Sequence, residues 1–137
     1  MEKNRNRRDR RSGFTLVELL VVMVILGLLA SIALPAVFNQ AEKARVGTAK
    51  TNIAALGAAL DAYALDVGSY PSDLDSLVRA PAGAQRWDGP YLKKKQIPKD
   101  PWGNDFEYKT PNSGEYELSS RGPDGNSGGG DDISSSD

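Results

Sequence analysis

The sequence of 137 residues contains no cysteine and no histidine. Without cysteine the chain can have neither a disulfide framework nor a thiolate zinc site. Without histidine it lacks the commonest general base and metal ligand, and also the usual partner of a catalytic serine. We therefore expect a protein that is not an enzyme, and its length is sufficient for one domain.

Charges of both signs are present in nearly equal number, with 17 basic and 18 acidic residues, but they are unevenly placed. Residues 1–13 hold six basic and two acidic residues, a net charge of +4, whereas the remainder holds 11 basic and 16 acidic residues, a net charge of −5. The 23 positions from Leu19 to Ala41 are uncharged. As a helix this segment is about 34 Å long, enough to span a hydrocarbon core of about 30 Å. The positive-inside rule predicts a single-pass inner-membrane protein with a cytoplasmic N-terminus.

Two other interpretations of these features remain open. The basic leader could be a nucleic-acid or anionic-lipid patch, but the apolar span explains its charge without a nucleic-acid partner. The apolar segment could also be an ordinary signal peptide, because small residues suited to cleavage occur at Ala30, Ser31, Ala33 and Ala36. The mature protein would then be a secreted periplasmic binding module or exoenzyme.

The charged residue at the edge of the apolar run is Glu18. A carboxylate drawn into lipid costs about 2 kcal/mol or more, so this position needs a partner. The string from Gly13 to Glu18, GFTLVE, followed by LLVVMVILGLLASIALP, resembles the class III leader of type IV pilins and type II secretion pseudopilins. The resemblance implies that a membrane aspartyl peptidase cuts between Gly13 and Phe14 and N-methylates Phe14.

In that family the glutamate is the fifth mature residue, which is Glu18 here. A free amine on Phe14 and the Glu18 carboxylate form an opposite-charge pair that an apolar filament core tolerates only if the two groups meet. They could pair within one helix, or between subunits, where the pairing would set the axial register. The alternative is that Glu18 extends to the membrane interface without a specific partner.

Beyond the apolar run the pattern predicts a second, amphipathic helical half over residues 42–67, ended by Gly68. Pro35 favours a kink or local unwinding but need not end the helix. One face carries an apolar stripe that should pack on a C-terminal globular part. Its members are Ala49, Ile53, Leu56, Leu60, Tyr63 and Val67.

The rest of the chain predicts a short helix, a long loop and a hairpin. Ser72 is placed to cap the short helix, and residues 80–104, rich in proline and glycine, form the loop. Phe106–Thr110 and Tyr116–Ser119 are strand-like runs joined by a turn. The predicted fold class is therefore α+β: a long N-terminal helix packed on a small antiparallel sheet with a long loop region.

The expected organisation has three parts. Residues 1–13 are a cleaved leader, residues 14–41 a transmembrane and filament-core helix, and residues 42–137 a periplasmic head. Within the head, helix 42–67 precedes loops and sheet over 68–120.

Four segments, GSYPSDLDSL, DGPYLKK, IPKDPWGNDFEY and YELSSRGPDG, are similar to the major pseudopilins of type II secretion. This resemblance implies a structural subunit of a homopolymeric periplasmic filament, the pseudopilus, which drives export of folded proteins across the outer membrane. It also implies minor pseudopilins, the prepilin peptidase and an inner-membrane secretion platform as partners. A type IV pilin for adhesion or motility shares the leader and stays open, although major type IV pilins usually close their C-terminal region with a disulfide.

The glycine-rich segment 122–132 combines five glycines with three aspartates. A flexible loop that brings carboxylates together suits calcium, although an EF-hand spacing is absent. Composition alone favours a disordered polar tail, and Ser134–Asp137 resemble a frayed end. The family resemblance implies that residues 121–133 bind calcium. The implied ligands are Asp124, Asp131 and Asp132, with backbone carbonyls of Arg121 and Asn126.

Overall fold

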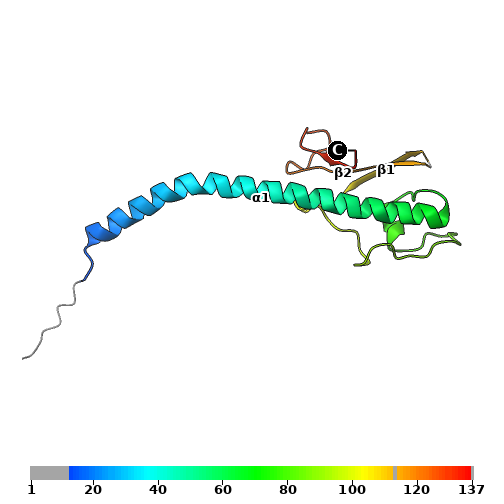
Figure 1. Cartoon of the computed structure of the whole chain (residues 1–137), viewed down its shortest axis with the longest axis horizontal. Coiled ribbons are helices and arrows are strands. Elements are labelled where there is room, and N and C mark those ends of the chain that lie inside the picture. The colour runs from blue at the N-terminus through cyan, green and yellow to red at the C-terminus, as the bar shows by residue number, and fades with distance from the viewer. Residues whose placement is uncertain (1–12, 113, 137) are drawn as a thin grey trace, which may run out of the picture. The chain divides into compact units, whose positions relative to one another are not determined.

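The computed structural model describes residues 13–112 and 114–136, so residues 1–12 of the predicted leader lie outside the described part. The chain divides into two units, residues 1–39 and 40–137. Helix α1, Leu16–Val67, contributes to both and includes Pro35, so the helix does not end at this proline. The second unit adds the 3-10 helix η1 and three strands (Figure 1). Their bounds are Leu74–Leu77 for η1, Glu107–Asn112 for β1, Glu115–Ser120 for β2 and Ile133–Ser134 for β3.

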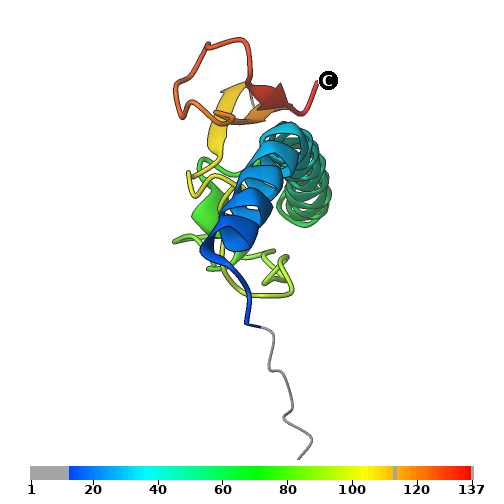
Figure 2. The ribbon, with the colours of Figure 1, turned by 90° about the vertical axis from the view of Figure 1, so that its left-hand side faces the viewer.

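The predicted apolar stripe of α1 forms one side of the core of the second unit. Ala49, Ile53, Leu56, Leu60 and Tyr63 are buried, and Val67 is half-buried at the end of the stripe. The sheet lies along one side of this half of α1, and η1 with the loop after it lies along another (Figures 1 and 2). The stripe packs there on Leu77, Phe106, Leu118 and Ile133.

The helix ends where the sequence predicts. Gly68 has φ +100°, a left-handed conformation that favours glycine, and its N–H donates to Ala64 O at 2.9 Å. The predicted cap of the next helix is wrong by one residue. Asp73, not Ser72, caps η1, because the Asp73 carboxylate accepts from the backbone N–H of Ser76 at 3.0 Å. Both residue types suit an N-cap, and the sequence does not distinguish between adjacent candidates.

The antiparallel hairpin is confirmed, with slightly longer strands than expected. β1 pairs with β2 in a sheet of order β1-β2-β3. The third strand was not predicted: Ile133 pairs with Ser120, and Ser135 N–H donates to Leu118 O at 2.8 Å. The frayed end expected from Ser134 is therefore wrong for the described residues, and Asp137 lies outside them. A two-residue strand is too short to produce a periodic pattern.

The long loop is confirmed and is held on the core by aromatic side chains. Between η1 and β1 the described residues form neither helix nor strand. Trp87 Nε1 donates to Ser76 O at 2.8 Å, and Tyr91 OH donates to Asp66 Oδ2 on α1 at 2.8 Å. Further along, Trp102 Nε1 donates to Glu42 Oε1 at 3.0 Å. The loop is thus bound to both ends of the amphipathic half of α1.

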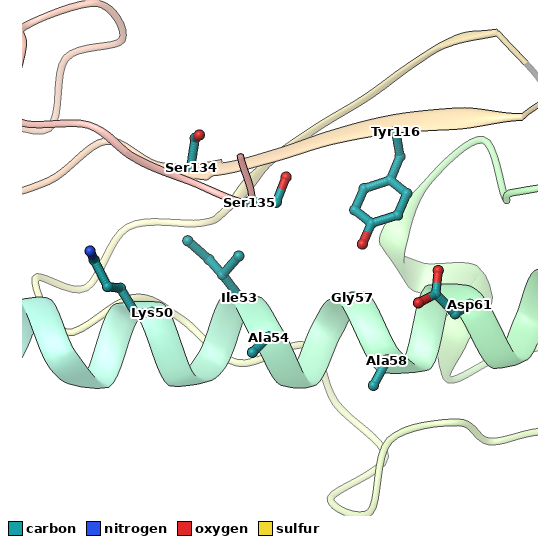
Figure 3. A pocket seen from close by; sticks show the side chains of 9 residues that line it. All are labelled: Lys50, Ile53, Ala54, Gly57, Ala58, Asp61, Tyr116, Ser134 and Ser135. Atoms are coloured by element: carbon teal, nitrogen blue, oxygen red, sulfur yellow. The ribbon is translucent and has the colours of Figure 1, made fainter. Parts of the chain in front are cut away.

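A cavity of about 410 Å³ lies between α1 and the sheet (Figure 3). At its floor Gly57 permits a close approach, because a Cβ at this position would lie 2.8 Å from Tyr116 OH. Figure 3 shows the Tyr116 ring reaching from β2 towards the helix at this point. A side chain on residue 57 would therefore require the Tyr116 side chain to move from its place over the helix.

Tyrosines of the head should make it sensitive to alkaline pH. Burial raises the pKa of Tyr108 from 10.0 to about 12, and Tyr108 OH donates to Pro71 O at 2.8 Å. Between these two values the unfolded chain loses this phenolic proton and the folded chain keeps it. Stability that is fully present below pH 10 should therefore fall as the pH rises towards 12.

Alkaline titration followed by tryptophan fluorescence and tyrosinate absorbance tests this expectation. Tyr108→Phe should lose less stability over the same interval than the parent, because the titrating group is gone. Equal losses in parent and variant would show that Tyr108 does not contribute.

Candidate functional site

The first candidate site lies at the start of α1. Residues 13–15 are not helical and Phe14 is 84% exposed. Among the described residues, apart from the adjoining one, no atom lies within 4 Å of a Cβ built on Gly13. The predicted scissile bond between Gly13 and Phe14 thus lies in exposed backbone immediately before the helix. Such a bond is accessible to a peptidase without unwinding of α1.

Glu18 has a local partner that sequence reasoning missed. Thr15 N–H donates to Glu18 Oε2 at 3.0 Å, and Glu18 N–H donates to Thr15 Oγ1 at 3.2 Å. This reciprocal pair is a capping box, which satisfies two N–H groups that a helix start leaves without partners. The signal was present in the sequence, because Thr-x-x-Glu before an apolar run is the pattern of that motif. In this structure Glu18 therefore caps the helix that follows the predicted cleavage point.

The apolar side chains of the first unit are turned outward. Large hydrophobic residues from Phe14 to Phe38 are exposed. α1 is long and apolar enough to cross a membrane by length and composition. An exposed apolar surface of this length requires a lipid or protein environment.

The second candidate site is the glycine-rich loop between β2 and β3. Asp124 Oδ1 accepts from Asn126 N–H at 2.8 Å, and Asp131 Oδ2 accepts from Asp124 N–H at 3.2 Å. A Cβ on Gly129 would lie 2.5 Å from Asp124 Oδ2 and 2.7 Å from Asp131 Oδ1. The two carboxylates therefore face the same space beside a glycine that leaves it open.

Asp132 has one satisfied and one unsatisfied oxygen. Its Oδ2 accepts from Gly128 N–H at 2.6 Å, whereas its Oδ1 is buried and has no hydrogen-bond partner among the described residues. A buried carboxylate oxygen without a partner is costly, and a bound ion or water is one explanation for such an atom. Hard carboxylate oxygens are also the ligands that calcium prefers.

The structure gathers the predicted calcium ligands only in part. Asp124 and Asp131 converge, and Asn126 contacts Asp124 directly. Over residues 13–112 and 114–136, no group of three or more acidic side chains is close enough to hold a metal by itself. A calcium site here would thus need backbone carbonyls as well, as expected for Arg121 and Asn126.

Glu107 on β1 holds this loop from outside, and sequence reasoning did not identify it. Its Oε1 accepts from Arg121 Nε at 2.9 Å, and its Oε2 accepts from Ser127 Oγ at 3.0 Å. The hydrogen bonds from Ser127 and Arg121 hold the pKa of Glu107 below its ordinary value. The contact joins residues 20 apart, so no local pattern could indicate it.

Two family models match the chain. Residues 36–136 match "Type II secretion system (T2SS), protein G". Residues 8–34 match "Prokaryotic N-terminal methylation motif", a range that includes Gly13, Phe14 and Glu18.

Similar proteins cover nearly the whole chain. The type II secretion system core protein G of Pseudomonas aeruginosa is 47% identical over 133 residues, which are 90% of this chain and 92% of the relative. That of Escherichia coli K12 is 45% identical, over 91% of this chain and 90% of the relative. Among solved structures, the major pseudopilin from the type 2 secretion system of enterohaemorrhagic Escherichia coli matches with a TM-score of 0.62 and 30% identity. The match covers 71% of this chain and 87% of the chain in that structure.

Proposed function

The chain belongs to the family of type II secretion system protein G, the major pseudopilins, and we infer that it is a structural subunit of a periplasmic pseudopilus. The observation that carries this function is the pair of family matches, which together extend from residue 8 to residue 136. The family is a structural one, not a known family of enzymes. The alternatives of a type IV pilin and of a secreted binding module or exoenzyme gain no support from these relatives.

We propose that the chain is first an inner-membrane protein with its N-terminus in the cytoplasm. The charge difference between the +4 leader and the −5 remainder supports this orientation. The prepilin peptidase would then cut after Gly13 and methylate Phe14, which lies in exposed, non-helical backbone.

Assembly would transfer the apolar half of α1 from lipid into a filament of identical subunits. The exposed side chains from Phe14 to Phe38 support this step, because copies of the same helix can cover one another's apolar surface. Minor pseudopilins and the inner-membrane secretion platform would be the other partners. Growth of the filament would drive folded proteins through the outer-membrane pore.

A secretion assay tests this function. A strain without its own protein G should recover export of its exoproteins when it produces this chain, and antibodies to the chain should label short filaments. Recovered export with an unprocessed chain and no filaments would contradict the proposal.

We further propose that residues 121–133 bind calcium through Asp124, Asp131 and Asp132, with the backbone carbonyls of Arg121 and Asn126. The shared space between Asp124 and Asp131 and the unpartnered Oδ1 of Asp132 support this site. Three like charges in one short loop repel unless a cation lies between them. The ion would supply that positive charge and fix the loop that leads into β3.

Calcium should therefore stabilise the head. With calcium at about 100 times its dissociation constant we expect a gain of about 2.7 kcal/mol, or about 10 °C in the melting midpoint. Melting of the full chain in detergent, followed by tryptophan fluorescence, measures this, because Trp87 and Trp102 both belong to the head. Excess chelator should reverse the gain.

Two variants complete the calcium test. Asp124→Ala should melt at nearly the same temperature with calcium and with chelator. Asp105→Ala removes an exposed aspartate outside the loop and should keep the parent's response. If the parent and Asp124→Ala respond alike, these carboxylates do not hold calcium.

A further inference from the structure

A buried carboxylate outside the glycine-rich loop, that of Asp100, is hydrogen-bonded to Ser120, where the chain enters the loop. Asp100 is only 5% exposed. Its Oδ1 accepts from the backbone N–H groups of Trp102 at 3.1 Å and Asn104 at 2.7 Å. Its Oδ2 accepts from Ser120 Oγ at 2.7 Å. Three donors therefore satisfy this carboxylate, and the third comes from a different part of the chain.

Ser120, the last residue of β2, continues the connection into the loop. Its side chain is fully buried, and its Oγ accepts from Gly122 N–H at 3.2 Å while it donates to Asp100. Gly122 has φ +66°, and a Cβ on it would collide with the backbone oxygen of Asp131 and lie 2.9 Å from Asp131 Oδ2. The peptide that Ser120 holds is thus the one against which Asp131 packs.

The same segment is also bound to α1. Trp102, whose N–H donates to Asp100, donates its indole N–H to Glu42 Oε1 at 3.0 Å. The start of the glycine-rich loop is therefore connected to the helix through Ser120, Asp100 and Trp102. Each link in this connection is a hydrogen bond of a buried or half-buried group.

We propose that Asp100 and Ser120 are positioning residues for the calcium site, an inference that rests on the calcium proposal above. Neither binds the ion. Asp100 fixes the hydroxyl of Ser120, Ser120 fixes the Gly122 peptide, and Gly122 fixes the backbone and carboxylate of Asp131. Loss of a group that orients a metal ligand typically weakens metal binding by 10- to 100-fold.

Calcium titration of the full chain in detergent, measured by calorimetry, tests this assignment. Ser120→Ala removes the hydroxyl that joins Asp100 to Gly122 and should weaken calcium binding by about 10-fold or more. Asp100→Asn should do the same, because an amide offers one acceptor oxygen to the three donors that converge there. Ser119→Ala is the matched control: it removes the same hydroxyl one residue earlier on β2, outside this chain of hydrogen bonds.

The double variant Ser120→Ala/Asp100→Asn separates positioning from general destabilisation. If Asp100 acts through Ser120, the calcium affinity of the double variant should be no lower than that of the single variant with the lower affinity. If the fold-decreases in calcium affinity of the two single variants multiply in the double variant, the proposal is overturned, because the two residues would then act independently. Tryptophan fluorescence without calcium verifies that each variant is folded, and Asp100→Asn carries the test if Ser120→Ala does not fold.

The outcomes for the two proposals differ. If the parent chain does not bind calcium, the calcium site itself is wrong. If the parent binds calcium and folded Ser120→Ala or Asp100→Asn binds it within twofold of the parent, the calcium site stands and the positioning role is overturned.

Discussion

Replacing Gly13 by leucine should abolish processing and leave the full leader on the chain. The expected effect is close to complete, because the peptidase must accept the residue before the scissile bond and the class III leader carries glycine there. The retained segment, with its net charge of +4, would also hold the N-terminus on the cytoplasmic side. Extraction into a filament should therefore fail together with cleavage.

The structure makes this experiment specific. Within the part of the chain that the structure describes, and apart from the adjoining residue, no atom lies within 4 Å of a Cβ built on Gly13, so a side chain there displaces no described group. A processing defect would then report the fit to the peptidase and not a misfolded substrate. Gly13→Ala, which adds only a methyl group, serves as the size control and should be processed more readily than Gly13→Leu. Mass spectrometry of the purified chain distinguishes the two forms, and normal mature Gly13→Leu would contradict the class III assignment.

Patterns that repeat along the chain predicted most of the fold. The stripe from Ala49 to Val67 identified the buried face of α1 because helical periodicity is a local property. Gly68 identified the helix end because a glycine at the end of a helix is also a local signal. By contrast, the two-residue β3 forms only because Ile133 returns to Ser120, a pairing that no local pattern encodes. The cap of η1 is Asp73 and not its neighbour Ser72, and a pattern that accepts either residue type cannot choose between adjacent positions.

The sequence predicted only those site residues whose neighbours along the chain already indicate their chemistry. Asp124 and Asp131 are marked by the glycines around them, and the structure does bring these two together. Glu107 and Asp100 lie in other segments. Glu107 contacts Ser127 of the loop and Asp100 contacts Ser120 at the end of β2, each across 20 residues. Their roles depend on the packed sheet, so they become visible only when the strands are in place.

The capping box of Thr15 and Glu18 raises a question about the role of Glu18 in assembly. One explanation is that Glu18 only starts the helix, a contribution of about 1 kcal/mol. The other is that its charge neutralises the amine of Phe14 in the filament core. Breaking a buried ion pair by removing one partner costs about 3 to 5 kcal/mol, so the second explanation predicts the larger effect.

Glu18→Leu should therefore be processed normally but fail to assemble. The substitution removes the charge and leaves the Phe14 amine as an uncompensated cation in an apolar core. It also removes the acceptor for Thr15 N–H, so this variant alone does not separate the two explanations. Filament yield, measured by shearing and immunodetection beside the amount of mature subunit in the membrane, gives the result.

Glu18→Gln is the variant that decides between capping and charge pairing. Its side-chain oxygen can still accept from Thr15 N–H, as Glu18 Oε2 does at 3.0 Å, but the negative charge is absent. If charge pairing drives assembly, Glu18→Gln should lose filaments as severely as Glu18→Leu, at a cost of several kcal/mol per subunit. If it assembles like the parent while Glu18→Leu fails, Glu18 acts as a helix cap. The pairing with the Phe14 amine would then be wrong, and the axial register of the filament would have to come from contacts elsewhere in the chain.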